Sequence, residues 1–477
     1  MQAVLRNPMK LRYLLVIVMA TTLGAGMISA RTWTSADGSK VFKAELIGFE
    51  DGQVTVQSSA GKKLTLNIGL LCAADQEFIK SDSSAKPVDT STLTGKLMCG
   101  YQGWFNCKND GAKLGWVHWG RARDAIPGPG NVTVDLWPDL TEHDPDERYI
   151  TNFHHANGRK AELFSSHNRK TVLRHFRWMR DYGIDGAFVQ RFANELSSER
   201  LRNHRNVVLT HCREGSRLNG RAYAVMYDLS GLRAGQVSRV WEDWRMLQAK
   251  MKFGEDPAYL KHRGKPLVAV WGIGFGDNRN YELAECAKLV ASLKASGCSV
   301  MVGVPSGWRK LDRDAAPDPG LHDILRKIDV LSPWNVGRYQ SREELEGHVK
   351  TIWLPDIAWC RKHNVDYLPT VYPGFSWHNL HGGKLNQVPR RKGEFLWSQF
   401  SAVRRVSAKM VYVAMFDEVD EGTAIFKCTN DPPMGEGVTF STFEGLPSDY
   451  YLRLCGLGAK MLRKEIPLSK KIPHPEK

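Results

Sequence analysis

"KMVYVAMFDEVDEGTAIF", residues 409–426, joins a short apolar run to four carboxylates within five positions. A run without polar alternation is typical of a strand in a parallel sheet, because both faces of such a sheet are covered. Seven earlier stretches have the same form, a short apolar or β-branched run followed by aromatic and polar residues. The repetition of this unit, more than any single run, indicates the fold.

The eight runs are "KLMCGYQGWF" (96–105), "DGAFVQRF" (185–192), "AYAVMYDLSG" (222–231), "PLVAVWGIGF" (266–275), "SVMVGVPSGW" (299–308), "VLSPWNVGRY" (330–339), "DYLPTVYPGFSW" (366–377) and "KMVYVAMFDE" (409–418). Segments of helical period separate them; Val172, Phe176 and Met179, for example, share one helix face. Strands that alternate with helices predict an α/β fold with a covered parallel sheet. Eight units over about 370 residues predict a (β/α)8 TIM barrel with insertions, the largest at 106–168.

The chain before the barrel divides into three parts. Residues 1–30 carry basic residues and then "YLLVIVMATTLGAGM", a run too short to span a bilayer at about 20 residues. They predict a signal peptide, and therefore an exported protein of the periplasm or the extracellular space with no membrane span. Residues 31–80 alternate as strands do and predict a small all-β domain. The polar residues 81–94 predict a linker, which leaves 95–477 for the barrel domain.

Composition restricts the classes of partner and cofactor. The net charge is +15 at pH 7, but the basic residues are scattered without a long basic run, which favours a solvated surface and no nucleic-acid partner. The nine cysteines show no CxxC pair, and the histidines lack the spacing of a metal site. We expect neither a metal nor a cofactor.

Active sites of TIM barrels lie at the C-terminal ends of the strands. The residues there are mostly aromatic or hydrogen-bonding, and such side chains stack on sugar rings and bond sugar hydroxyls. A single tryptophan more often packs in a core, but the recurrence at one end of the barrel favours a carbohydrate cleft. The predicted substrate-binding residues are Tyr101, Trp104, Gln190, Arg191, Asp228, Trp334, Tyr372, Trp377 and His378.

The carboxylates after the eighth run allow two readings. A solvated acidic loop or a helix N-cap explains Asp417 and Asp420. Glu418 and Glu421 stand in a Glu-x-x-Glu-Gly-Thr sequence that directs both carboxylates into one cleft if the chain turns between them. Glycoside hydrolysis requires such a pair, one acting as acid and the other as base.

The stretches "FDEVDEGTAIF", "GYQGWF", "YGIDGAFVQRF" and "TVYPGFSWHN" resemble glycoside hydrolase family 99 and its family 71/99-like relatives, from about residue 95 to 430. The resemblance implies an endo-acting, retaining, metal-independent enzyme that cleaves an α-mannan or a related polysaccharide. It implies that Glu418 deprotonates the sugar 2-hydroxyl, that Glu421 protonates the leaving oxygen, and that a 1,2-anhydro sugar is the intermediate. Where the family commonly has "EWHEGT", this chain has "EVDEGT", which leaves the identity of the sugar open.

The N-terminal "RTWTSADG" and "LCAADQEFIK" resemble the bacterial Sla homology module, an SH3-like barrel. This resemblance implies an interaction module that binds a protein or a surface partner; a passive domain that only adds stability is the alternative. A second function also stays open from the sequence, that of a carbohydrate-binding or scaffold protein on a catalytically degenerate barrel. Release of oligosaccharides from α-linked glycans discriminates between the two functions.

Overall fold

The computed structural model describes residues 31–50, 52–58, 61–73, 75–76, 79 and 87–473. The chain forms two compact units, Met1–Ile79 and Lys80–Lys477. The predicted signal peptide lies outside the described residues, as do residues 81–86 of the predicted linker. No helix in the described ranges has the length and apolarity needed to cross a bilayer.

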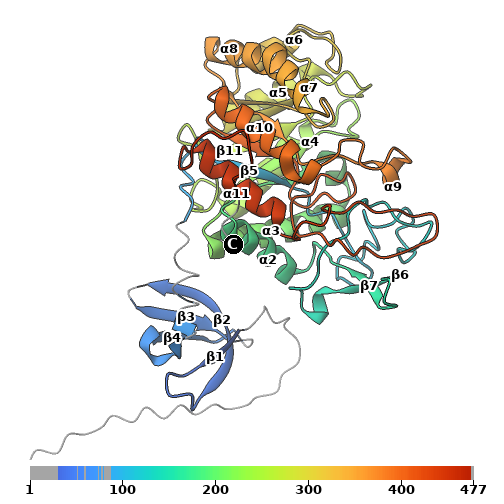
Figure 1. Ribbon diagram of the computed structural model, residues 1–477. Helices are drawn as coiled ribbons and strands as arrows, with labels where there is room; N and C mark the ends of the chain where they lie inside the picture. The colour runs from blue at the N-terminus through green and yellow to red at the C-terminus, as the bar shows by residue number, and fades with distance from the viewer. Residues whose placement is uncertain are drawn as a thin grey trace, which may run out of the picture. The chain divides into compact units, whose positions relative to one another are not determined.

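The first unit contains an antiparallel sheet of four strands paired in chain order (Figure 1). Its elements are β1 (Arg31–Thr34), β2 (Val41–Glu50), β3 (Gln53–Gln57), β4 (Lys63–Asn67) and the 3-10 turn η1 (Ile68–Leu70). Trp33 is fully buried at the centre of a small core, and its indole N–H donates to the carbonyl of Ala44 at 2.7 Å. The unit therefore contains the predicted β-sheet, and the described residues 73, 75, 76 and 79 after it are helical. Its assignment as an SH3-like module stays a prediction.

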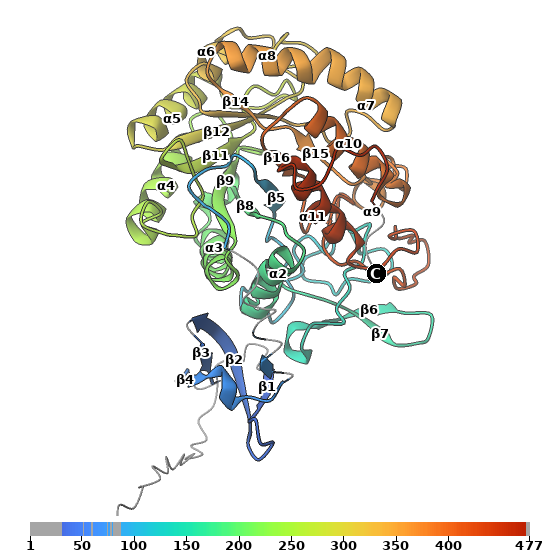
Figure 2. The same ribbon diagram turned by 60° about the vertical axis from the view of Figure 1, so that its left-hand side comes forward.

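The second unit is built on a curled parallel sheet with helices outside it (Figure 2). Its strands are β5 (Leu97–Tyr101), β8 (Gly186–Phe192), β9 (Ala222–Asp228), β11 (Lys265–Trp271), β12 (Ser299–Val304), β13 (Val330–Pro333), β14 (Asp366–Tyr367), β15 (Thr370–Val371) and β16 (Val411–Val413). They pair in the order β14-β13-β12-β11-β9-β8-β5-β16-β15, and the two-residue β10 (Lys261–His262) pairs antiparallel with β11.

The two ends of this pairing order belong to one predicted strand. Only Leu368 and Pro369 separate β14 from β15. The Leu368 N–H donates to Leu331 of β13 at 2.9 Å, whereas the Pro369 carbonyl accepts from Tyr412 of β16 at 3.0 Å. The first half of the seventh strand, β14, therefore pairs with the sixth strand, and its second half, β15, pairs with the eighth. Each of the eight apolar runs contains at least one strand, the seventh containing both β14 and β15, and the predicted α/β fold of the TIM-barrel type is confirmed.

Helices cover the outside of the sheet: α2 (Arg169–Asp181), α3 (Glu199–Asn219), α4 (Ser238–Met251), α5 (Leu283–Ala295), α6 (Gly320–Leu325), α7 (Arg342–His348), α8 (Leu354–Lys362), α9 (His378–His381), α10 (Glu394–Arg405) and α11 (Tyr450–Leu462). Short turns are η2 (Pro145–Glu147), η3 (Ala193–Ser197), the π-helical η4 (Val349–Trp353) and η5 (Arg391–Gly393). Asn168 caps α2, and Ser341 caps α7. Pro355 lies in the first turn of α8, and the π-helical η4 joins α7 to α8 without a break.

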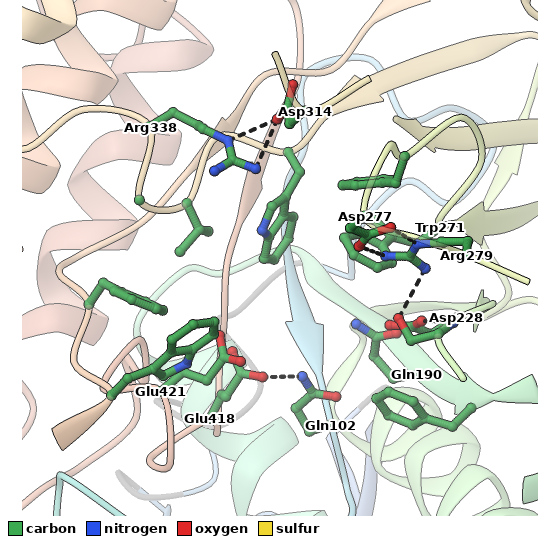
Figure 3. Close-up of a pocket in the computed structure, with 18 of the residues that line it drawn as sticks. Gln102, Gln190, Asp228, Trp271, Asp277, Arg279, Asp314, Arg338, Glu418 and Glu421 are labelled. Carbon is green, nitrogen blue, oxygen red and sulfur yellow. Dashed lines mark hydrogen bonds and ion pairs between the residues drawn. The ribbon is translucent and has the colours of Figure 1, made fainter. Parts of the chain in front are cut away.

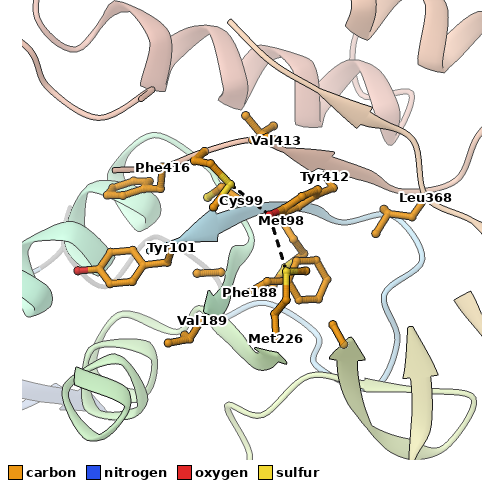
Figure 4. Close-up of a cluster of buried hydrophobic side chains, with 14 of the residues drawn as sticks. Met98, Cys99, Tyr101, Phe188, Val189, Met226, Leu368, Tyr412, Val413 and Phe416 are labelled. Carbon is orange, nitrogen blue, oxygen red and sulfur yellow. Dashed lines mark hydrogen bonds between the residues drawn. The ribbon is translucent and has the colours of Figure 1, made fainter. Parts of the chain in front are cut away.

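The barrel interior is filled by residues that alternate along the strands. Met98 of β5, Phe188 of β8 and Met226 of β9 gather around Tyr412 of β16 (Figure 4). The Tyr412 hydroxyl donates to the Met226 sulfur at 3.9 Å, and its ring meets Phe188 edge to face at 5.5 Å. Because the side-chain period of a strand is two, the intervening residues point outward to the helices.

Residues 87–94 belong to the second unit, although their composition predicted a linker. The Val88 N–H donates to the Gly220 carbonyl at 2.9 Å, and the Thr90 hydroxyl donates to the Pro257 carbonyl at 2.7 Å. Leu93 is fully buried. These hydrogen bonds and this burial attach the segment to the barrel.

The insertion at 106–168 forms the hairpin of β6 (Tyr149–His154) and β7 (Lys160–Leu163), and its buried aromatic residues join the core of the barrel. The backbone N–H groups of Asp135 and Leu136 both donate to the carbonyl of Val419, at 2.9 and 3.2 Å. The insertion therefore contacts the acidic loop that follows β16.

A glycine in α11 permits close packing at the base of α2. A Cβ on Gly456 would lie 2.0 Å from the Tyr182 carbonyl oxygen, so the Gly456→Ala variant should lose about 1–3 kcal/mol of unfolding free energy. Gly347 of α7 has nothing within 4 Å of the same added atom. Gly347→Ala should therefore be neutral or gain up to about 1 kcal/mol. Urea unfolding of the full chain measures both, and equal stability of the two variants contradicts the packing.

Candidate functional site

The acidic loop after β16 is anchored by Asp417. Its carboxylate is fully buried and accepts the backbone N–H groups of Gln102, at 2.8 Å, and Gly103, at 2.9 Å. Burial raises the pKa of Asp417 to about 7, although the two N–H donors oppose the shift. The prediction of a solvated loop or a helix cap is wrong for Asp417 and also for Asp420, which is 2% exposed. Asp417 is bonded to the segment that follows β5, and Asp420 lies against His118 of the insertion.

Glu418 follows directly and faces the cleft (Figure 3). Its side chain accepts a hydrogen bond from the Gln102 amide at 2.5 Å and another from the Thr423 hydroxyl at 2.8 Å. The loop curls back on itself, because the Glu418 carbonyl accepts the N–H groups of Thr423 and Ala424 at 3.1 and 3.0 Å. Glu418 is thus held at both carboxylate oxygens and at its backbone.

Glu421 lines the same cleft from the other side of the turn. Its backbone carbonyl accepts the Ser376 N–H at 2.9 Å, and its side chain hydrogen-bonds the side chain of Trp377. Burial, reinforced by the charge of Asp420, raises the pKa of Glu421 to about 8. Burial and the neighbouring Glu421 also raise the pKa of Glu418 well above its usual range. Burial and the neighbouring negative charges therefore favour the protonated form of both carboxyls.

The cleft has a volume of about 510 Å³ and lies at the C-terminal ends of the strands. Of the predicted residues, the structure brings together Trp104, Gln190, Asp228, Trp334 and Trp377 with the two glutamates. Trp377 is 37% exposed at the rim. Asp228 is buried opposite the glutamates, burial raises its pKa, and its carboxylate accepts the Ser230 N–H at 2.7 Å.

Trp104 presents only its edge to the cleft. Its indole stacks on the ring of His118, with ring centres 3.7 Å apart, and also on the ring of Phe192, with ring centres 5.0 Å apart. The indole N–H is buried without a hydrogen-bond partner in the described part of the chain. A ligand in the cleft therefore cannot stack on the ring, and Trp104 forms part of the cleft wall.

Two predicted residues point away from the cleft because of strand alternation. Tyr101 faces α2, where its hydroxyl lies 2.9 Å from the His175 ring nitrogen. Arg191 is fully buried against α4 and donates twice to Asp243, at 2.9 and 2.6 Å. Their neighbours along the two strands, Gln102 and Gln190, line the cleft instead. The prediction that Tyr101 and Arg191 contact a ligand is wrong.

Tyr372 and His378 also lie outside the cleft lining. Tyr372 is buried, and its hydroxyl donates to the Tyr339 carbonyl. The His378 backbone N–H donates to Asp135 at 2.8 Å, and its ring lies 2.9 Å from the Gly383 carbonyl. Both side chains support the loops around the site, which corrects their predicted binding role.

Several cleft residues escaped the sequence prediction, most of them in irregular loops after the strands. Arg279 is held by Asp277 at 2.8 Å and covers the rings of Trp271 and Phe275, at 5.1 and 4.7 Å. Others are Gln102, Phe192, Asp314, Arg338 and Gln387. Gln102, Phe192, Trp271 and Phe275 carried a signal, since each lies at or directly after the end of a strand or of a predicted run. No group of three or more potential metal ligands occurs among the described residues.

The chain matches no protein-family model and no curated protein sequence. Among solved structures it is similar to the GH99 endo-α-mannosidase of Bacteroides thetaiotaomicron, in a complex with bis-tris-propane, with a TM-score of 0.57 and 17% identity over 78% of this chain and 98% of that chain. A second structure of a GH99 endo-α-mannosidase from that organism gives a TM-score of 0.56 and 16% identity over 78% and 99%. At these identities the likeness establishes a shared fold.

The raised pKa of Glu421 makes stability depend on pH. Between 4.5, the ordinary value, and about 8, the folded chain holds a proton that the unfolded chain has lost, so stability falls as pH rises through this window. Glu421→Gln removes this ionisation. The difference between the thermal midpoints of the variant and the parent should therefore shift in favour of the variant as the pH rises from 4.5 to about 8. The exposed Glu436 provides the control Glu436→Gln. A difference independent of pH contradicts the burial of this carboxyl.

Proposed function

We propose that the protein is a retaining α-glycoside hydrolase that acts internally on an α-mannan or a related polysaccharide. The observation that carries the proposal is the pair of carboxyls, Glu418 and Glu421, in one cleft with Trp334 and Trp377. Burying two carboxyls side by side costs stability, and a site that only binds sugar gains little from that cost. A pair that acts as acid and base in bond cleavage requires two carboxyls in one such cleft. The shared fold with GH99 endo-α-mannosidases supports the same reaction class.

The hydrogen bonds favour different roles for the two glutamates. Burial raises the pKa of Glu418 well above its usual range, but its two donors, Gln102 and Thr423, oppose this rise by stabilising the ionised form, which suits a base. Glu421 has a pKa of about 8 and holds its proton at neutral pH, which suits an acid. We assign Glu418 to the sugar 2-hydroxyl and Glu421 to the leaving glycosidic oxygen.

The reaction then has two steps. Glu418 takes the proton of the sugar 2-hydroxyl, and the 2-oxygen of the sugar attacks the anomeric carbon. At the same time Glu421 gives its proton to the departing glycosidic oxygen. The product of this step is a 1,2-anhydro sugar, and no bond to the enzyme forms. Glu421, now ionised, next takes a proton from water, which opens the three-membered ring as Glu418 returns its proton to the sugar 2-oxygen. Two inversions at one carbon leave the configuration retained.

We further propose that the protein is exported, on the basis of the basic and apolar residues 1–30. An exported enzyme meets polysaccharides too large to enter a cell. The four-stranded N-terminal unit would then bind a protein or a surface partner near the substrate. Detection of the mature chain in the periplasm or the medium tests the export.

Each glutamate should be required for the rate. Glu418→Gln and Glu421→Gln should each lower kcat on an α-linked oligosaccharide by about 10²–10⁴-fold, the usual contribution of one general acid or base. A glycosyl fluoride should restore part of the Glu421→Gln rate, because a fluoride leaves with little proton donation. It should restore none of the Glu418→Gln rate, since the 2-hydroxyl still lacks its base.

A 2-deoxy substrate should resist even the unmutated enzyme, and Glu436→Gln, an exposed change, should leave the rate unaltered. Rapid cleavage of the 2-deoxy substrate, or a sugar ester trapped on either glutamate, rules out this division of roles. Binding of glycans without any release of oligosaccharides instead indicates a carbohydrate-binding protein on a degenerate barrel.

Trp334 should contribute to substrate binding rather than to folding. Its side chain is half-buried in the cleft wall, so Trp334→Ala should raise KM several-fold, as expected for the loss of one ring contact, with a small change in the thermal midpoint. Trp359 of α8 is also half-buried but packs on Trp308 away from the cleft. Trp359→Ala should lower the thermal midpoint and leave KM unchanged. The reverse pattern would place Trp334 in the core.

A further inference from the structure

A histidine from the insertion reaches the acidic loop. His118 Nδ1 lies 3.0 Å from Asp420 Oδ2, although 302 positions separate the two residues. The histidine is fixed on two other sides. The Thr133 hydroxyl donates to its carbonyl at 2.6 Å, and its ring stacks on Trp104 at 3.7 Å. The contact with Asp420 therefore belongs to a fixed arrangement of the insertion.

Asp420 has the less favourable environment of the two. Its side chain is 2% exposed, whereas that of His118 is 30% exposed. Its second oxygen, Oδ1, has no hydrogen-bond partner in the described ranges. A buried carboxylate is stabilised by a nearby cation, and His118 can supply one when it carries two protons.

The position of Asp420 couples this contact to the catalytic pair. It lies between Glu418 and Glu421 in sequence and lies close enough for its charge to act on both. The charge of Asp420 raises the pKa of Glu421 and, to a smaller degree than burial and Glu421, that of Glu418. Any group that neutralises Asp420 therefore changes how readily the glutamates ionise.

We propose that His118 and Asp420 form an ion pair whose combined charge sets the protonation of the Glu418–Glu421 pair, which makes His118 a positioning residue supplied by the insertion. The significance of the ion pair for catalysis rests on the proposed function. With His118 doubly protonated, the ion pair is neutral and Glu418 can ionise. Without that proton, Asp420 adds an uncompensated negative charge beside the glutamates and holds a second proton on them.

Other charges also face this cluster, and they remain in place when His118 or Asp420 is changed. Asp417 precedes Glu418, Asp228 lies across the cleft, and Asp135 lies on the insertion beside Val419. Arg205 donates to the Gln102 carbonyl, and Arg390 donates to the carbonyls of Gly422 and Ala424, the latter at 2.7 Å. A change in protonation seen only in variants of His118 and Asp420 therefore reports their own charges.

The two members of the ion pair should have opposite effects. His118→Gln removes the cation, so the midpoints at which Glu418 and Glu421 ionise should move to higher pH by about one unit, the lower end of the effect of a charge at this range. Asp420→Asn removes the anion, and both midpoints should move to lower pH. In the variant with both changes, the midpoints should lie between those of the two single variants.

Carbon NMR of the full chain, labelled at the glutamate carboxyls, measures these midpoints without requiring turnover. The Glu418→Gln and Glu421→Gln variants assign the two signals. The matched control is His155→Gln, because His155 also comes from the insertion and also contacts an aspartate after β16, Asp431, but lies outside the cleft lining. This control should leave both midpoints unchanged.

The pH profile of kcat/KM gives the second readout, and both of its limbs should move in the directions seen by NMR. Unchanged midpoints in His118→Gln, or shifts of the same sign in His118→Gln and Asp420→Asn, overturn the inference. Opposite shifts by NMR in a protein that cleaves no glycan leave the ion pair established and overturn the proposed function alone. A thermal midpoint for each variant, measured alongside, shows that the shifts come from folded protein.

Discussion

The hydrogen bonds from the backbone of Gln102 and Gly103 to the Asp417 carboxylate hold the site together. They connect the ends of β5 and β16, which are the first and eighth strands of the barrel and adjacent in the sheet. Arg205 bonds the carbonyls of the same two residues, at 2.9 and 3.4 Å, so this strand end is held on both sides. The Gln102 amide is thereby placed 2.5 Å from Glu418. A buried carboxylate that costs stability in isolation here fixes the position of the glutamate that follows it.

The insertion adds a second set of constraints from outside the barrel. Asp135 donates its N–H to Val419 and accepts the N–H groups of His378 and Asn379, at 2.8 and 2.7 Å. One residue thus connects the loop after β16 with the loop after β15. The insertion also supplies His118, which packs on Trp104 at the cleft wall. The site therefore depends on a segment that is distant in sequence from both glutamates.

The sequence predicted the barrel well, because strands buried on both faces read as short apolar runs, and all eight runs contain a strand. It predicted the glutamate pair because the spacing is local. The sequence-based prediction was wrong for residues whose role depends on side-chain orientation or on contacts between segments distant in sequence. Tyr101 and Gln102 are neighbours, and only the strand register decides which one enters the cleft. Asp417 read as solvated because its partner, Gln102, lies 315 positions away.

The central claim is that Glu418 and Glu421 divide one cleavage of a glycosidic bond between them, and it is tested most directly by the configuration of the first product. Proton NMR during hydrolysis of an α-linked manno-oligosaccharide distinguishes the two anomers before they interconvert. The account predicts that the α-anomer appears first, because displacement by the 2-oxygen and then by water inverts the anomeric carbon twice. The initial appearance of the β-anomer would contradict it, since a single displacement by water leaves no role for a base at the 2-hydroxyl.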